Sequence, residues 1–317
     1  MDQVCGDSSV QPRRQLLAAA YREVCVLELD ALKPGNVHRA ADGHGMTVAD
    51  FLQSAEVSAG PLTAPGLGLG ERIYGAVAAT RAAVGCNTNL GIVLLCAPLL
   101  QAALAAAPAG SLRTRLSAVL LAADRTDTAG LNRAIQLAAP GGLGTSARHD
   151  VTRPATAAPL AVMAAAAHRD RIARQYSEHY QDLFARAVPL FERLAARWQD
   201  PTWATVGLYL DFLGRFADTH IARKLGLAQA RAVTRRAAPL AAAVVRAAHP
   251  APYREALLDF DRELKAAGRN PGTTADLTVA CLLISRLKPL CHDSLTTAVY
   301  RRTPCTGPVP PAPVISF

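Results

Sequence analysis

Aromatic residues and strand-like patterns are scarce in this sequence. Phenylalanine, tryptophan and tyrosine together make up 5% of its 317 residues, and stretches in which β-branched and polar residues alternate are almost absent. Such stretches are typical of β-strands, whereas the alanine and leucine that dominate here are strong helix formers. The composition therefore predicts an all-α protein, which we expect to be a single large multi-helical bundle around a buried central helix.

Lysine is scarcer still, with four residues against 30 arginines in a chain of net charge +9. A bias in base composition is one explanation for this preference, and affinity for polyanions is the other. The arginines are spread along the whole chain, and no basic run is interleaved with aromatic residues. Nucleic acid is therefore not an expected partner, whereas a phosphorylated small molecule is.

The sequence has neither a Cys-x-x-Cys pair nor a signal-peptide pattern. Its seven cysteines are an odd number, and several lie within apolar stretches, which argues against a disulfide framework and a zinc site. The first residues lack the basic-then-apolar order of a signal peptide. We therefore expect a reduced, cytoplasmic protein.

Charged residues are absent from residues 92–110. Residues 92–106 are apolar on every helical face, which is typical of a helix inside a protein core or a membrane. Pro98 and Gln101 interrupt the stretch, and no aromatic belt flanks it. These features favour a buried central helix over a membrane span, so a membrane is not an expected partner.

Residues that often begin helices precede this stretch. Asn87, Thr88 and Asn89 are of the types found at helix starts, where free backbone N–H groups can bind an anion. Gly91 would let a ligand approach the backbone closely. The sequence therefore predicts a phosphate-binding mouth at the start of the central helix.

Three other loops also pair glycine with polar residues at a helix end. They are Lys33-Pro34-Gly35, Gly43-His44-Gly45 and Asn270-Pro271-Gly272-Thr273-Thr274-Ala275-Asp276. In a bundle such ends can converge and supply backbone donors, a lysine and carboxylates for magnesium. They predict a pocket for a magnesium–phosphate ligand, although Lys33 alone could equally be a surface residue in a turn.

Two further segments carry weaker signals. A glycine-rich loop at residues 140–151, which includes Gly142, lacks the Gly-Lys-Ser/Thr of a P-loop. Further along, Arg223 and Lys224 are neighbouring cations that could bind phosphate. Asp218, just before them, could cap a short helix or bind a metal ion.

The chain shows no clear domain linker. Other helices are predicted at residues 12–30, 48–58, 69–84, 112–123, 128–138, 154–167, 170–197, 202–216, 227–248 and 253–267, with a last one from the Asn270 loop to about residue 290. The segment at residues 169–197 is the most clearly amphipathic and is expected at the periphery. We expect residues 1–302 to form a single helical catalytic domain and the proline-rich residues 303–317 to form a tail.

The motifs also carry a resemblance to a known family. They occur in the order Glu28, Lys33-Pro34-Gly35-Asn36-Val37, Gly43-His44, Phe51 with Ser54, Gly85 with Asn87-Thr88 and Gly91, Gly141-Gly142-Leu143-Gly144, Asp218-Thr219 with Arg223-Lys224 and Gly226, and Asn270-Pro271-Gly272-Thr273 with Ala275-Asp276-Leu277. With these motifs, the chain resembles the triphosphoribosyl-dephospho-CoA synthase family over roughly residues 15–290. The resemblance implies an all-α enzyme that joins the triphosphoribosyl group of ATP to the 2′-hydroxyl of 3′-dephospho-CoA and releases adenine.

Some positions depart from the citrate-lyase type of that family, which typically reads Pro-Lys-Pro-Gly, His-x-Asp-Met and Asn-Thr-His-Lys-Gly. Leu32 precedes the lysine here, Gly45-Met46 follows the histidine, and Asn89-Leu90 replaces the His-Lys pair. The predicted site thus lacks one carboxylate and one cation, which indicates a different substrate or altered metal binding.

Two alternatives follow from these departures. The sequence resembles family members that accompany tetrahydromethanopterin biosynthesis, so a related phosphoribosyl step with a pterin-pathway acceptor is the second interpretation. The third is a non-enzymatic helical binding protein that has kept the fold.

Cleavage of a nucleotide N-glycosidic bond needs an acid for the leaving adenine, a base for the incoming hydroxyl and cations for the triphosphate. We expect Glu28, His44 and Asp276 to be catalytic, with His44 as the acid, and Asp218 and Asp276 to hold Mg²⁺. The residues expected to bind ATP or its phosphates are Lys33, Gly35, Asn87, Thr88, Gly91, Gly142, Arg223, Lys224, Thr273 and Thr274. The expected substrates are ATP and dephospho-CoA or a pterin-pathway intermediate, and alanine-rich exposed faces are compatible with a homodimer.

Overall fold

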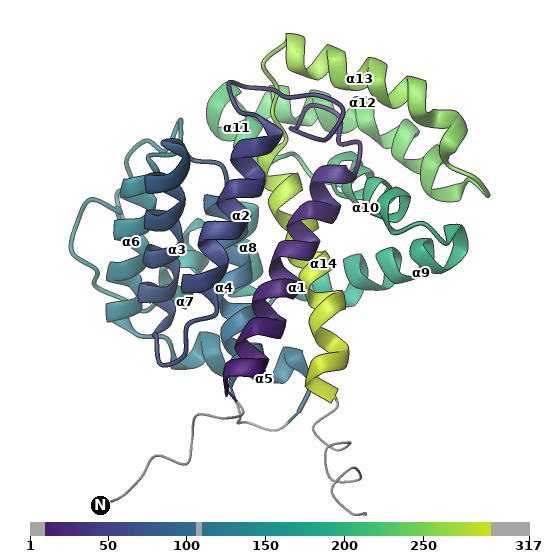
Figure 1. Ribbon diagram of the computed structural model, residues 1–317. Helices are drawn as coiled ribbons and strands as arrows, with labels where there is room; N and C mark the ends of the chain where they lie inside the picture. Colours follow the sequence, from purple (N-terminus) through teal and green to yellow (C-terminus); the bar gives the residue numbers. More distant parts are fainter. Residues whose placement is uncertain (1–9, 106–109, 293–317) are drawn as a thin grey trace, which may run out of the picture.

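The computed structural model describes residues 10–105 and 110–292. Within these ranges the chain forms α-helices and no β-strand, which confirms the all-α prediction (Figure 1). The first seven helices are α1 (Val10–Asp30), α2 (Val48–Leu62), α3 (Leu69–Val84), α4 (Leu90–Leu104), α5 (Leu112–Ala122), α6 (Arg125–Ala138) and α7 (Pro159–Ala166). The others are α8 (Arg171–Ser177), α9 (Val188–Trp198), α10 (Pro201–Arg215), α11 (Thr219–Leu225), α12 (Leu227–Arg246), α13 (Arg254–Ala266) and α14 (Gly272–His292).

Helices α4 and α14 lie side by side at the centre of the bundle, and α1 packs against both (Figure 1). Twelve of the fifteen residues of α4 are buried, so the prediction of a central helix buried on all sides is confirmed. Since α14 shares that position, the bundle has two central helices. No helix in the described ranges is long and apolar enough to cross a membrane.

A tyrosine hydroxyl replaces the N–H that the proline inside α4 lacks. Pro98 has no N–H to donate to the carbonyl oxygen of Leu94. The hydroxyl of Tyr176 donates to that oxygen at 2.5 Å, and the hydroxyl of Tyr180 donates to the oxygen of Leu95 at 2.9 Å. Because a buried carbonyl without a donor is destabilising, the Tyr176 hydroxyl allows the interrupted helix to stay in the core.

The prediction of one peripheral helix over residues 170–197 is wrong. The chain forms α8, turns at His179 and Tyr180 with φ of +48° and +57°, and continues through five π-helical residues into α9. Tyr176 and Tyr180 are fully buried against α4. The amphipathic pattern reported the exposed Arg and Glu side chains correctly, but it did not show that the opposite face belongs to the centre of the core.

A second hydrophobic cluster anchors the residues just before the Lys33-Pro34-Gly35 loop. Helices α10, α12 and α13 contribute most of this cluster, which also contains Ala31 and Leu32 at the end of α1. The loop that follows α1 is therefore fixed at its first residues. The predicted domain boundary at residue 302 and the tail at residues 303–317 lie outside the described residues.

Candidate active site

A cavity of about 1290 Å³ lies where the ends of several helices meet. Its wall is formed by the end of α1, the following loop, the starts of α4, α11 and α14, α6 to α8, and the glycine-rich loop between α6 and α7. Typical small-molecule sites measure roughly 300–1,000 Å³. This cavity is larger, as a site for two substrates would have to be.

Most of the residues predicted for the site line this one cavity. They are Glu28, His44, Asn87, Thr88, Gly91, Gly142, Arg223, Lys224, Thr273 and Asp276. The expectation that the polar loops converge is therefore confirmed. Four of the predicted residues, Lys33, Gly35, Asp218 and Thr274, are not part of the lining, and their positions differ from those expected.

Lys33 lies behind the wall rather than on it. Its side chain is fully buried, and its ammonium donates to the Glu28 carboxylate and, at 3.1 Å, to Oδ1 of Asn36. Burial lowers the pKa of Lys33 and raises the pKa of Glu28, while the attraction between the two charges opposes both shifts. Lys33 is thus neither the surface residue of a turn nor in contact with the cavity, and it holds Glu28 from behind.

Asp218 takes the helix-capping alternative. Its Oδ1 accepts from the N–H of Ile221 at 3.0 Å, at the start of α11. Its Oδ2 accepts from the N–H and the hydroxyl of Thr274 at 2.7 and 2.8 Å, at the start of α14. The carboxylate therefore ties two helix starts together. Because both carboxylate oxygens of Asp218 already accept from protein donors, Asp218 does not fit the metal-binding role expected for it. Thr274 donates its N–H and its hydroxyl to Asp218, so these groups are not directed at a phosphate.

Gly35 and Gly91 also have protein partners where ligands were expected. The Gly35 N–H donates to Oδ1 of Asp261 at 2.8 Å, so it is not free for a phosphate. At Gly91 a side-chain Cβ would overlap the carboxylate of Asp276. The close approach that Gly91 permits is therefore used by the Asp276 side chain at the start of α4.

Asp276 is the carboxylate at the centre of the wall. Burial raises its pKa well above the usual range, and the nearby charges of Asp218 and Glu28 raise it further, whereas Arg223 opposes them. Among the described residues no group of three or more His, Cys, Asp or Glu side chains could hold a metal ion by itself. A magnesium ion at Asp276 would therefore need phosphate oxygens as further ligands, as is common for Mg²⁺.

Cations outnumber carboxylates on the cavity wall. Six arginines and one lysine line it, against four carboxylates. The cations are Arg148, Arg169, Arg171, Arg174, Arg215, Arg223 and Lys224, and the carboxylates are Glu28, Asp150, Asp170 and Asp276. Within the described ranges, Arg148, Arg169 and Lys224 form no ion pair. Apart from Arg223 and Lys224, these cations were missed, because arginines spread evenly along a sequence give no signal of where they gather.

Comparisons with known proteins agree with this geometry. Residues 14–293 match the family described as ATP:dephospho-CoA triphosphoribosyl transferase. The chain belongs to this family. The predicted family and the predicted enzyme class, a triphosphoribosyl transferase with ATP as a substrate, are thereby confirmed.

The fold agrees with a solved structure as well. The crystal structure of a candidate triphosphoribosyl-dephospho-CoA synthase from Archaeoglobus fulgidus is similar, with a TM-score of 0.57 at 20% sequence identity. The similarity covers 74% of this chain and 97% of that one. No curated protein matches the chain.

His220 is a lining residue of this triphosphoribosyl transferase that the sequence did not single out. Burial, together with the charges of Arg223 and Lys224, lowers its pKa to about 4, so the imidazole is neutral at pH 7. A side chain on Gly272 would overlap the imidazole of His220, which shows how closely α11 packs on the start of α14. The sequence feature that could have identified His220 as a site residue is its position two residues after Asp218.

One side of the transferase cavity is apolar. Its lining includes Leu94 of α4, Leu131 and Ile135 of α6, and Met163 of α7. Asn132 lies among them, nine-tenths buried, and its Oδ1 has no hydrogen-bond partner in the described part of the chain. This side can hold an uncharged part of a substrate, and it provides an amide for hydrogen bonding.

The departures from the citrate-lyase type of the family alter the cavity wall itself. Leu90 and Gly45 both line the cavity. Asn89, by contrast, is buried and donates to the hydroxyl of Ser58 at 3.4 Å. Of the replaced His-Lys pair, therefore, only the second position faces the ligand space, and it presents an apolar side chain there.

Proposed function

We propose that this cavity transfers the triphosphoribosyl group of ATP to the 2′-hydroxyl of 3′-dephospho-CoA and releases adenine. The observation that carries the proposal is the cation-rich wall, which surrounds two carboxylates, Glu28 and Asp276, at the meeting point of α1, α4 and α14. Family membership supplies the reaction, and the wall supplies the charges that a triphosphate needs.

The triphosphate binds among the cations near α11 in this proposal. Lys224 and Arg169 have no carboxylate partner in the part of the chain that the structure describes, and Arg223 lies 3.9 Å from Asp170. Thr273 adds a hydroxyl group from the start of α14, and it accepts from the Thr219 hydroxyl at 3.0 Å, so its own proton is left for a phosphate. Charge-assisted hydrogen bonds of this kind hold phosphates strongly. The Thr88 hydroxyl is instead bonded to that of Ser54 at 2.6 Å.

Asp276, together with phosphate oxygens of the substrate, would hold magnesium. Mg²⁺ in phosphoryl sites is commonly bound by one or two carboxylates and the substrate phosphates, and Asp276 is a carboxylate of the cavity wall that is affected by the charge of Arg223. When bound, the ion neutralises phosphate charge. Because burial raises the pKa of Asp276, a bound cation would favour the ionised form of this carboxyl.

The chemical step breaks the bond between the ribose C1′ and adenine and forms a bond from C1′ to the acceptor oxygen. Adenine leaves with the bonding electrons and takes a proton, for which His44 is the donor. The acceptor hydroxyl loses a proton, for which the Glu28 carboxylate is the base. General acids and bases contribute roughly 10²- to 10⁴-fold each to such reactions.

The acceptor binds along the apolar side. The pantetheine arm of dephospho-CoA is long and mostly uncharged, so it fits the wall formed by α4, α6 and α7. A second acceptor, a pterin-pathway intermediate, is favoured by a specific observation: Leu90 and Gly45 line the cavity where the citrate-lyase type has a cation and a carboxylate nearby. With either acceptor, ATP is the donor substrate, adenine is released, and Glu28 and Asp276 have the same roles.

The decisive experiment is incubation of the purified protein with ATP, Mg²⁺ and dephospho-CoA, followed by chromatography for adenine. Adenine released in proportion to dephospho-CoA consumed supports the first acceptor. Adenine released only when a pterin precursor replaces dephospho-CoA supports the second. No adenine with either acceptor, from protein that binds ATP, favours a binding protein without transferase activity.

Two further properties remain proposals. Because ATP and dephospho-CoA are soluble metabolites of the cell interior, we place the protein in the cytoplasm. Alanine-rich outer faces support a homodimer, which sedimentation of the purified protein tests directly.

A further inference from the structure

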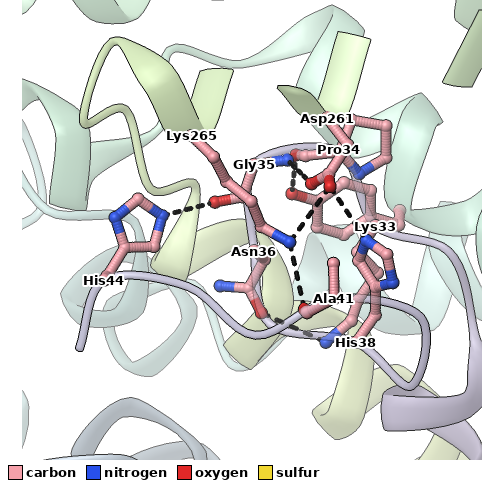
Figure 2. A network of polar contacts seen from close by, with 10 residues as sticks. Lys33, Pro34, Gly35, Asn36, His38, Ala41, His44, Asp261 and Lys265 are labelled. Carbon is pink, nitrogen blue, oxygen red and sulfur yellow. Dashed lines mark hydrogen bonds and ion pairs between the residues drawn. The ribbon is translucent and has the colours of Figure 1, made fainter. Parts of the chain in front are cut away.

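The peptide groups on either side of Gly35 connect α13 to His44 (Figure 2). On one side, the Gly35 N–H donates to Oδ1 of Asp261 at 2.8 Å. On the other side, the Gly35 carbonyl oxygen lies 2.8 Å from Nε2 of His44. Gly35 has φ of +83°, and a Cβ there would lie 2.8 Å from a Leu264 methyl group. Its backbone therefore has little freedom to move.

The partner of Nε2 decides where His44 carries its proton. A carbonyl oxygen only accepts hydrogen bonds, so Nε2 of His44 must be the protonated nitrogen. Nδ1 has no hydrogen-bond partner among the described residues. Because His44 lines the cavity, Nδ1 is the ring atom that remains for a substrate.

Asp261 is itself held firmly. Its side chain is buried, and its Oδ2 lies 3.0 Å from Nζ of Lys265 and 3.3 Å from Nε2 of His38 (Figure 2). Lys265 also donates to the carbonyl oxygen of Ala41 at 3.0 Å, in the loop that leads to His44. Burial favours the neutral acid, but hydrogen bonds from His38, the Gly35 N–H and Lys265 outweigh it and lower the pKa of Asp261. The group is an anion at neutral pH and a fixed acceptor.

We infer that Asp261 is a positioning residue: through Gly35 it fixes His44 with a proton on Nε2, so that Nδ1 is the atom that gives a proton to the leaving adenine. The inference rests on the proposed function for its proton step. In that step the imidazolium of His44 transfers the Nδ1 proton to an adenine nitrogen, the C1′–N bond breaks toward adenine, and the ring remains neutral with Nε2–H until water returns a proton.

Two variants of His44 separate positioning from proton transfer. The amide of glutamine can occupy the place of Nε2, so His44→Gln keeps a donor to Gly35 and lacks Nδ1. The amide of asparagine lies near the place of Nδ1, so His44→Asn loses the bond to Gly35. We expect H44Q to bind ATP with KM within about threefold of wild type while kcat falls about 10²-fold or more. A kcat for H44Q close to that of wild type would overturn the assignment of Nδ1.

Two variants of Asp261 test the positioning role. Asp261→Ala removes the acceptor for the Gly35 N–H, and we expect kcat to fall about tenfold or more with KM less affected, since a misplaced catalytic group can reduce rates up to about 10²-fold. Asp261→Asn keeps an acceptor oxygen and should retain more of kcat than D261A, which also covers the case in which D261A folds poorly. Asp259→Asn is the matched control, because Asp259 is exposed on the same helix.

A spectroscopic measurement tests whether Asp261 positions His44, and it does not depend on enzyme activity. In protein labelled with ¹⁵N-histidine, long-range proton–nitrogen NMR spectra report which ring nitrogen carries the proton, and loss of signals in H44Q identifies those of His44. We expect the Nε2–H form in wild type, D259N and D261N, and a mixture of forms in D261A. An Nδ1–H form in wild type, or an unchanged His44 spectrum in D261A, overturns the inference. Wild-type protein that releases no adenine overturns the proposed function and its proton step instead, whatever the spectra show.

Discussion

The Asp276 carboxylate occupies the space where a side chain on Gly91 would lie. Gly91 is the second residue of α4 and Asp276 belongs to the first turns of α14, so this contact joins the starts of the two central helices. The glycine is therefore required by a neighbouring side chain rather than by a ligand.

Gly91→Ala is expected to destabilise the wild-type protein by about 1–3 kcal/mol, because an added methyl group in a packed site forces its neighbours to shift. In an Asp276→Ala background the same change should be neutral or stabilising by up to about 1 kcal/mol, since alanine is the better helix former. Denaturant unfolding of the four proteins gives the coupling energy. Gly75→Ala in α3, where a Cβ would lie 3.4 Å from Pro61, is the control and should not destabilise. Equal effects of G91A in both backgrounds would contradict the contact.

Asp276→Asn should stabilise the protein at pH 7 and have little effect near pH 4. An acid whose pKa is higher in the folded chain than in the unfolded chain destabilises the fold as pH rises above the unfolded value, about 3.9 for Asp. The pKa of Asp276 is raised by burial first and then by Asp218 and Glu28, so the penalty is absent at low pH and present at neutral pH. Thermal unfolding of both proteins between pH 4 and 8 measures the difference. A stabilisation by D276N that grows on acidification would refute this assignment.

Lys33→Met should destabilise the protein by about 3–5 kcal/mol, the usual effect of leaving one partner of a buried ion pair unpaired. Adding Glu28→Gln should recover part of that loss, because the remaining group is then uncharged. The stability of K33M and of K33M/E28Q, measured by denaturant unfolding, checks the pairing. A K33M protein of normal stability with a raised KM for ATP would instead support the direct phosphate contact first expected for Lys33.

Lys224→Ala should raise the KM for ATP about 10- to 100-fold with little loss of stability. Lys224 is exposed on the cavity wall and has no ion-pair partner in the described ranges, and a charge-assisted hydrogen bond is worth about 1.5–3 kcal/mol. Lys288→Ala is the control, since Lys288 pairs with Glu192 away from the cavity. Steady-state kinetics at low and high salt should show the difference between the two variants shrinking as salt screens the charge. Equal KM values for both variants would exclude Lys224 from the phosphate site.

Local patterns predicted the framework well. The apolar run at residues 92–106 indicated a buried helix, and the helix predicted from residue 48 is α2, which Thr47 and Asp50 cap. The polar loops at helix ends do converge on one cavity. These predictions succeeded because helix periodicity, capping and turn chemistry depend on residues within a few positions of one another.

The partner of each polar group could not be predicted in the same way. Lys33 was expected to bind a phosphate, but it is paired with Glu28. For Asp218 the sequence allowed either a helix cap or a metal ligand, and in the structure it caps α11. The amphipathic stretch before α9 was placed at the surface although Tyr176 donates to α4 inside the core. In each case the deciding contact comes from packing or burial that no local pattern records.

The sequence by itself determined most of the helices, the central apolar segment, the loop chemistry and the family, because all of these depend on residue type and order along the chain. The tertiary structure alone decided which groups face the cavity. It turned Glu28, His44 and Asp276 toward that space and placed Lys33, Gly35 and Asp218 behind it as their supports. The physical reason is that burying a charged or polar group requires a partner, and in a bundle that partner comes from whichever helix packing brings within reach.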